Sequence, residues 1–351
     1  MTTPLPLPPV PARIVAAPMA GGPSTPALVA AVGAAGGLGF LAAGYRTPTQ
    51  LRADVAAVRD RGPAPFGVNV FAPVAERPEE VARLAGYAER IAGRGARFGV
   101  APGTPAHGDD AFGAKAELLA ELRPDVASFT FGLPPEDLVR DLHAARVPVW
   151  VTVTSPEDAV AAAATGADAL VVQGWEAGGH RGGLTDEEPA QLGLLPLLAL
   201  VRRVTPLPLV AAGGIADGAG VAAVLAAGAA LAQLGTAFLR TPEAGTPPVH
   251  AAALAEGRPT TVTRAFTGRR ARALVNDAVR ALDADAPAAY PEVHFLTAPV
   301  RAAARTAGDP EDAHLWAGQA AALAEPVPAG ELVGRLAADA RAALDAAARP
   351  R

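Results

Sequence analysis

The sequence contains no cysteine in its 351 residues, and this absence excludes several kinds of chemistry. Disulfides, zinc–thiolate sites, iron–sulfur clusters and a cysteine nucleophile all need that side chain. No two histidines have the spacing of a metal-binding pair, so we expect no metal site. Any redox chemistry must therefore come from a bound cofactor.

Lysine is also scarce, since Lys115 is the only one among the 30 lysines and arginines, and the formal net charge is -5. The absence of a basic block argues against nucleic acid or an anionic membrane surface as a partner. No apolar run is long enough to cross a bilayer, and the proline-rich start, residues 1–11, lacks the features of a secretory signal. We expect a cytoplasmic protein with a small-molecule partner, and the sequence leaves open whether it forms a homo-oligomer.

Short apolar segments alternate with alanine-rich helical stretches from Arg13 to Leu239. This alternation is typical of βα units and a parallel sheet, and the nearly continuous apolar character suits strands that are covered on both faces. Eight segments are expected to be strands: 13–17, 38–41, 66–70, 126–131, 149–153, 169–173, 209–212 and 231–235. Eight such units predict an α/β fold of the (β/α)₈ TIM barrel type.

The βα alternation stops at Thr241, where turns rich in proline and glycine begin. Helical pieces are expected over residues 273–282 and 311–324, and the spacing of apolar residues predicts an amphipathic helix over 329–348. We therefore predict a barrel core over residues 12–240, and a smaller helical cap with C-terminal helices packed on the barrel over 241–351.

Glycines follow the last two predicted strands, at the end of a barrel where active sites lie. Gly213 and Gly214 come after the seventh strand, and the eighth ends in residues 233–236. Bare glycine backbone at these two strands commonly holds phosphate, Asp217 can cap the following helix, and Thr236 adds a hydroxyl donor. The glycine pair alone fits a turn without a ligand equally well, but its combination with 233–236 favours a phosphate site.

His180 is the most informative side chain, because it follows the sixth strand in the glycine-rich stretch Glu176-Ala177-Gly178-Gly179-His180. In such a loop nothing packs an imidazole for structural reasons. An imidazole that titrates near neutrality can take a proton from carbon or hold an anionic substrate. Glu176 and Arg181 are expected to fix the loop by an ion pair or by hydrogen bonds.

Three further side chains near strand ends are candidates for contacts with a flat ring. Met19 and Asn69 could lie against such a ring and hydrogen-bond it, although methionine more often fills a core. Gln173 ends an apolar strand and needs a partner when buried, which the polar edge of a ligand would supply.

The other histidines carry less information. His107, His143 and His250 lie outside any motif, and we expect them to be solvated. His294 and His314 lie in the cap region, where they could line the mouth of a substrate site, although packing or solvation is the simpler interpretation.

With these residues the chain resembles the bacterial FMN-dependent nitronate monooxygenases, formerly called 2-nitropropane dioxygenases. The Glu176–His180 stretch is specific to this resemblance, whereas the glycine pair alone is not. The resemblance covers residues 14–336 and is strongest in 17–25, 173–182, 211–214 and 233–238. It implies a monooxygenase that oxidises alkyl nitronates, such as propionate-3-nitronate, or nitroalkanes with dioxygen to a carbonyl compound and nitrite, through a flavin semiquinone.

The resemblance also implies roles for individual residues. His180 would be the catalytic base or the partner of the substrate anion, and Met19 would lie against the isoalloxazine. The other FMN contacts would be Asn69, Gln173, Gly178, Gly179, Gly213 and Gly214, with Gln233, Leu234, Gly235 and Thr236 around the phosphate. Some relatives place a lysine or tyrosines in the cap near the substrate, whereas residues 297–299 here offer no cation and leave Tyr290 and His294 as the nearest polar candidates.

Three alternatives remain open. An FMN-dependent enoyl-acyl-carrier-protein reductase shares the barrel and a similar glycine–histidine loop, but it needs NAD(P)H, for which no convincing second nucleotide site is visible. A non-redox phosphate-binding barrel, similar to inosine-monophosphate dehydrogenase or an isomerase, would use the same two strands, although the missing cysteine counts against the dehydrogenase. A degenerate barrel that only binds a ligand is less attractive because His180 is intact.

Overall fold

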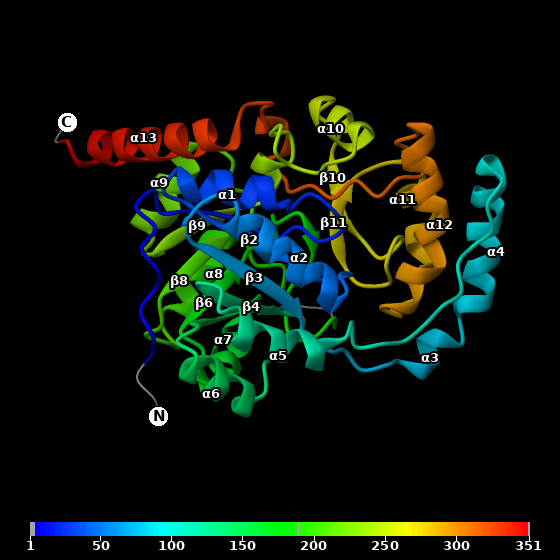
Figure 1. The fold of residues 1–351 in the computed structure, drawn as a ribbon. Coiled ribbons are helices and arrows are strands. Elements are labelled where there is room, and N and C mark those ends of the chain that lie inside the picture. The colour runs from blue at the N-terminus through cyan, green and yellow to red at the C-terminus, as the bar shows by residue number, and fades with distance from the viewer. Residues whose placement is uncertain (1–3, 188–189, 350–351) are drawn as a thin grey trace.

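A computed structural model describes residues 4–187 and 190–349, so the first three residues of the proline-rich start and the last two of the range 241–351 lie outside the described part. Eight parallel strands form a closed barrel (Figure 1). The last of them, β9, pairs with β1 and so closes the barrel. These strands are β1 (Ile14–Ala16), β2 (Leu38–Ala42), β3 (Phe66–Phe71), β4 (Val126–Thr130), β5 (Val149–Val153), β6 (Ala169–Gln173), β8 (Leu209–Ala212) and β9 (Leu231–Leu234). The predicted TIM barrel is confirmed, with every strand end within one residue of its expected position.

Large side chains fill the barrel near the N-terminal ends of its strands. Phe40 and Trp150 are fully buried there with ring centroids 5.6 Å apart, and Val10 of the N-terminal segment packs in the same cluster. Gly67 makes room for them, because a Cβ at this position would lie 2.2 Å from the Phe40 ring. The interior is therefore packed at this end, and a ligand site is left to the C-terminal ends of the strands.

Helices surround the barrel, and several begin at capping residues that the sequence supplies. The side chains of Thr25, Thr47, Ser155 and Asp217 each accept a hydrogen bond from a backbone N–H in the first turn, which confirms the expected cap at Asp217. The helices are α1 (Pro26–Ala34), α2 (Pro48–Arg59), α5 (Phe112–Leu122), α6 (Glu136–Ala144), α7 (Pro156–Ala164), α8 (Leu194–Val201) and α9 (Gly218–Ala226). The last helix, α13 (Ala329–Ala348), has the predicted bounds and packs on α9 and α1 (Figure 1).

The cap combines helices with a small antiparallel sheet. The sheet has the order β10 (Thr260–Thr263), β11 (Ala271–Leu274), β7 (Gly179–His180). Its helices are α3 (Pro78–Val81), α4 (Leu84–Gly95), α10 (Pro248–Ala255), α11 (Asp277–Leu282) and α12 (Glu292–Ala307), with short 3₁₀ turns at Ala96–Phe98, Asp283–Asp285 and Ala321–Leu323. A further 3₁₀ turn, Thr236–Phe238, directly follows β9 of the barrel. Tyr87 and Ile91 of α4 share a hydrophobic cluster with Phe266 and Leu296, so the segment after β3 packs beside α12 at the cap (Figure 1).

The two helical pieces expected in the cap, over residues 273–282 and 311–324, are not formed as predicted. Residues 273–282 divide into the end of β11 and the helix α11, because the backbone of β11 pairs on one side with β10 and on the other with β7. Residues 311–324 contain only the 3₁₀ turn, since the Leu315 carbonyl and the Ala317 amide bond to the backbone of β11. None of the described helices combines the length and the apolar character that a membrane crossing requires.

Candidate active site

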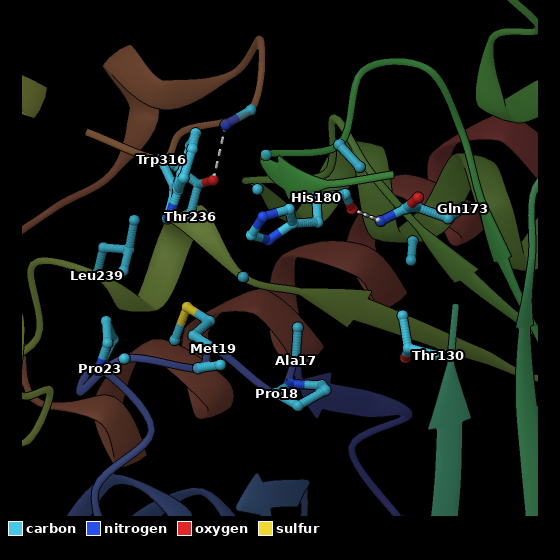
Figure 2. A pocket seen from close by; sticks show the side chains of 18 of the residues that line it. Ala17, Pro18, Met19, Pro23, Thr130, Gln173, His180, Thr236, Leu239 and Trp316 are labelled. Carbon is cyan, nitrogen blue, oxygen red and sulfur yellow. Dashed lines mark hydrogen bonds between the residues drawn. The ribbon is translucent and has the colours of Figure 1, made fainter. Parts of the chain in front are cut away.

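A cavity of about 360 Å³ lies between the C-terminal ends of the strands and the cap (Figure 2). Its walls include every residue expected to act as the base or to contact FMN except Leu234, whose side chain is packed in the barrel's hydrophobic core. The candidates brought together are Met19, Asn69, Gln173, Gly178, Gly179, His180, Gly213, Gly214, Gln233, Gly235 and Thr236. Convergence of the strand ends thus collects residues that lie far apart in the sequence.

One end of the cavity offers backbone and hydroxyl donors. Gly213 and Gly214 have φ angles of 112° and 70°, which favour glycine. The amides of Gly214, Gly235 and Thr236 have no acceptor among the described residues. The Thr236 hydroxyl oxygen accepts a hydrogen bond from the Gly318 amide at 3.0 Å, so its own proton is available to a ligand. This set of uncharged donors suits a phosphate.

Apolar surfaces bound the middle of the cavity. Figure 2 shows Met19 and Trp316 on either side of the open space into which the His180 ring points. A Cβ on Gly235 would lie 3.5 Å from the Ala17 Cβ and 3.8 Å from the Met19 Sδ, so glycine here leaves room beside these side chains. The resulting slot is suited to a flat aromatic ring.

His180 lies in a strand rather than in the loop expected from the sequence, because β7 pairs with β11 and places His180 opposite Ala271. Its ring is surrounded by aromatic side chains, with ring centroids 5.3 Å from Trp316 and 5.7 Å from Phe131. Burial, with Arg269 and Arg301 nearby, lowers the pKa of His180 from 6.5 to about 3. The imidazole is therefore neutral at physiological pH.

The side chain of Gln173 hydrogen-bonds to the backbone on either side of Arg181, and not to a ligand as expected. Its side-chain amide donates to the His180 carbonyl at 3.1 Å (Figure 2), and its Oε1 accepts from the Gly182 amide at 2.9 Å. Arg181 donates to the Gly174 carbonyl at 2.6 Å. These bonds fix the backbone on both sides of His180.

The neighbouring loop residues act in the same way. Glu176 accepts hydrogen bonds from the Leu194 amide at 3.0 Å, and no ion pair between Glu176 and Arg181 occurs among the described residues. A Cβ on Gly178 would lie 2.4 Å from the Gly318 amide nitrogen, so the cap backbone passes directly over this glycine. The specific glycine–histidine stretch therefore also serves the contact between barrel and cap.

Asn69 is buried at the cavity wall. Its side-chain amide donates to the hydroxyl oxygens of Ser128 at 2.9 Å and of Thr130 at 3.0 Å. These bonds hold the amide nitrogen against β4, and they leave the carbonyl oxygen of the side chain as the group that can meet a ligand.

Two guanidinium groups in the cavity wall were missed by sequence reasoning. Arg301 is buried and Arg305 half-buried, both line the cavity, and neither has a carboxylate partner in the described ranges. Arg301 donates to Thr297 Oγ1 at 2.9 Å and to the His294 carbonyl at 2.8 Å. Both arginines also reach His314 Nδ1, at 3.2 and 3.3 Å.

These contacts hold two positive charges at the cavity without compensating them. Burial lowers the pKa of Arg301 only to about 10, so the group stays charged at neutral pH. An uncompensated buried charge is costly unless a ligand of opposite charge pairs with it. Residues 294, 297, 301 and 305 recur at helical spacing. Had the helix α12 been expected, this spacing would have indicated that these polar residues share one face of it.

Further polar groups near His180 come from the connection after β2 and from the cap. Tyr45 stacks on His294 with ring centroids 4.2 Å apart, and its hydroxyl lies 3.1 Å from that of Tyr290. Burial raises the pKa of Tyr45 to about 12, so this hydroxyl keeps its proton. His294 lines the cavity as expected, whereas Tyr45 was missed because nothing in its own segment marks it.

The expectation that three histidines are solvated is largely wrong. His250 is buried in α10 and donates to the Trp316 carbonyl at 2.9 Å, and burial lowers its pKa to about 4. His143 pairs with the buried Asp168 at 2.9 Å. His107 is partly exposed but lies 2.8 Å from a Glu292 oxygen. Each ring therefore has a structural partner.

Comparisons with known proteins agree with this geometry. A family model described as nitronate monooxygenase matches residues 10–339. The nitronate monooxygenase of Pseudomonas aeruginosa is 41% identical over 339 residues, which cover 92% of this chain and 94% of that protein. The solved nitroalkane oxidase of Streptomyces ansochromogenes is 47% identical with a TM-score of 0.93, covering 97% and 98% of the two chains. FabK from Thermotoga maritima is 26% identical with a TM-score of 0.74, covering 95% and 94%.

Proposed function

The chain belongs to the nitronate monooxygenase family, and from this premise we propose that it is an FMN-dependent enzyme that oxidises alkyl nitronates or nitroalkanes with dioxygen. The products are a carbonyl compound and nitrite. The observation that carries the proposal is the pairing, in one cavity, of the neutral base His180 with the uncompensated cations Arg301 and Arg305.

The residues of the cavity fit FMN. The free amides of Gly214, Gly235 and Thr236 suit its phosphate, and the slot beside Met19 suits its ring. When bound, FMN supplies the transfer of electrons from the substrate to dioxygen, which no side chain of this cysteine-free chain can perform. The protein's own part is to position the substrate and to manage charge and protons.

His180, Arg301 and Arg305 have complementary roles in one proton transfer: His180 accepts the proton, and the arginines stabilise the anion that is left. The unprotonated nitrogen of His180 accepts the proton from the α-carbon of a neutral nitroalkane, and the electron pair of that bond passes into the nitro group. The nitronate so formed is an anion, and Arg301 and Arg305 stabilise it. A nitronate that enters already ionised needs only the arginines.

The first test is a visible spectrum of the purified protein, followed by anaerobic addition of propionate-3-nitronate. We expect a flavin spectrum that changes on addition of the nitronate, and nitrite once air is admitted. A flavin that ignores the nitronate but is bleached by NAD(P)H would instead support the enoyl-acyl-carrier-protein reductase. A colourless protein that takes up no FMN would contradict both assignments.

A further inference from the structure

The hydroxyl of Thr267 connects His180 to the cap. Thr267 lies between β10 and β11, is only 1% exposed, and places its Oγ1 2.9 Å from His180 Nε2 and 3.2 Å from the Arg269 carbonyl oxygen. We propose that Thr267 is a positioning residue that holds His180 as the Nε2–H tautomer and so makes Nδ1 the atom that takes the substrate proton. This inference rests on the proposed function for the identity of the substrate.

The direction of the two hydrogen bonds follows from the number of protons. A hydroxyl has one proton to donate, and a carbonyl oxygen can only accept. The Arg269 carbonyl receives no other hydrogen bond from the described residues, so the Thr267 hydroxyl donates to it. The Thr267 oxygen then accepts from His180, which requires a proton on Nε2. The opposite direction would leave a buried carbonyl facing an oxygen lone pair, and such unsatisfied groups are costly.

The position of Arg269, whose carbonyl accepts the Thr267 hydrogen bond, is itself fixed by several contacts. Its Nε donates to the Arg181 carbonyl at 3.1 Å, its Nη2 donates to the Gly183 carbonyl at 2.7 Å, and its guanidinium lies 4.1 Å from the Phe131 ring centroid. The segment that follows β7 therefore anchors the residue whose carbonyl orients Thr267. The acceptor for the hydroxyl proton is fixed by packing and does not depend on a ligand.

The other ring nitrogen is left for the substrate. His180 lines the cavity, and its Nδ1 has no hydrogen-bond partner in the part of the chain that the structure describes. The charged or titratable groups that face the ring are Arg269, Arg301, His294 and Tyr290, and none of them is an acid that would protonate it.

The proton transfer balances without a rearrangement of this network. The C–H bond of the nitroalkane breaks, an N–H bond forms at Nδ1, and the electron pair moves into the nitro group. Nε2–H keeps its hydrogen bond to Thr267 throughout, so the ring does not have to rotate or exchange partners. The positive charges of Arg269 and Arg301 disfavour the imidazolium form of His180. The nitronate anion that forms in the same step offsets this repulsion.

The tautomer can be read directly by nuclear magnetic resonance. The purified protein is labelled with ¹⁵N-histidine, and the His180 signals are assigned by their absence from His180→Gln. We expect wild-type Nε2 to have the chemical shift of a protonated nitrogen and Nδ1 that of an unprotonated one. In Thr267→Val the two nitrogens should move towards averaged values, and Thr267→Ser should restore the wild-type pattern. A protonated Nδ1 in the wild type would overturn the proposal, whatever the enzyme's substrate.

Kinetics separate positioning from a structural role. We compare 1-nitropropane with its preformed nitronate, because only the neutral compound needs the base. Thr267→Val should lower kcat/KM for 1-nitropropane by at least roughly tenfold, as expected for a misplaced general base, and change it by less than about twofold for the nitronate. Thr267→Ser should recover both values.

Two other outcomes have distinct meanings. Equal losses on both substrates, with flavin content also reduced, would make Thr267 a structural residue and overturn the proposal. If Thr267→Val folds poorly, Thr267→Ala replaces it in both experiments. The ¹⁵N spectrum of the wild type tests the tautomer without any variant at Thr267. Failure of the wild type to oxidise either substrate would refute the proposed function instead, and the tautomer measurement would still stand.

Discussion

Gly235 allows the flavin site to be tested without damage to the barrel. Its φ angle of −108° is accessible to any residue, and an added Cβ would make only ordinary contacts with Ala17 and Met19. A valine would therefore be accommodated by the protein, while its two methyl groups would take up space beside Met19 that is assigned to FMN. Overpacking of this kind costs about 1–3 kcal/mol. We expect Gly235→Val to bind FMN roughly 5- to 150-fold more weakly than the wild type.

The assay compares four proteins: wild type, Gly235→Ala, Gly235→Val and the control Gly113→Ala, whose added Cβ would meet nothing within 4 Å. FMN content is read from the visible spectrum, FMN affinity from flavin fluorescence during reconstitution, and Tm from the apoprotein. Valine should weaken binding more than alanine does, with the apoprotein Tm unchanged. Wild-type affinity in Gly235→Val would refute the placement of the flavin beside Gly235.

Gly214 shows why the choice of glycine matters. Its φ of 70° disfavours a side chain, and a Cβ there would lie 3.0 Å from the Glu176 Cβ. We expect Gly214→Val to lose FMN and folding stability together, so a normally yellow and stable variant would contradict the phosphate assignment. Gly235→Val separates these two effects and Gly214→Val does not.

Three further predictions concern charge. His180→Ala should retain FMN but lose neutral-nitroalkane turnover by roughly 10²–10⁴-fold, and unchanged rates in a nitrite assay would remove His180 from the mechanism. Arg305→Met should lower kcat/KM for propionate-3-nitronate by roughly 10- to 150-fold, the value of one charge-assisted hydrogen bond, without loss of Tm; an unchanged kcat/KM would argue against the anion-binding wall. Burial lowers the folded-state pKa values of four histidines from 6.5: those of His180, His250 and His294 to about 3, 4 and 2, and that of His314 well below its usual range. The unfolded chain therefore takes up protons first, so stability should be complete above about pH 6.5 and fall by about 5 kcal/mol per pH unit near pH 5. Urea titrations at pH 5, 6 and 7 that coincide would contradict these pKa shifts.

The barrel was predictable from the sequence because its strands are specified locally. Strands buried on both faces need short, continuous apolar segments, and Val149–Val153 and Ala169–Gln173 end where the sequence predicts. The location of the site was predictable for the same reason, since residues at the C-terminal ends of the barrel strands must lie close together. Gly213, Gly235 and His180 are close together for that reason.

The cap was less predictable because its elements depend on distant partners. The four residues Ala271–Leu274 form a strand by pairing with β10 and with His180 of β7, neither of which is visible in their own sequence. Pro299 lies inside α12 and interrupts the pattern that would have predicted a helix. Arg301 and Arg305 were missed as a consequence. The partners of Gln173 were also not foreseen, because they are backbone groups whose positions depend on the loop conformation.

The division of the molecule into barrel and cap corresponds to a division of the chemistry. The barrel supplies the donors at Gly214, Gly235 and Thr236 that suit a phosphate, whereas the charges that act on a substrate come from the cap. Protonation of His180 in the free enzyme is opposed by burial and by Arg269 and Arg301. Protonation that also creates an anion in the cavity is opposed far less, because the anion and the arginines attract each other. His180 is therefore a weak base towards solvent and a stronger one towards a substrate that becomes a nitronate, and this selectivity depends on the cap being in place over the barrel.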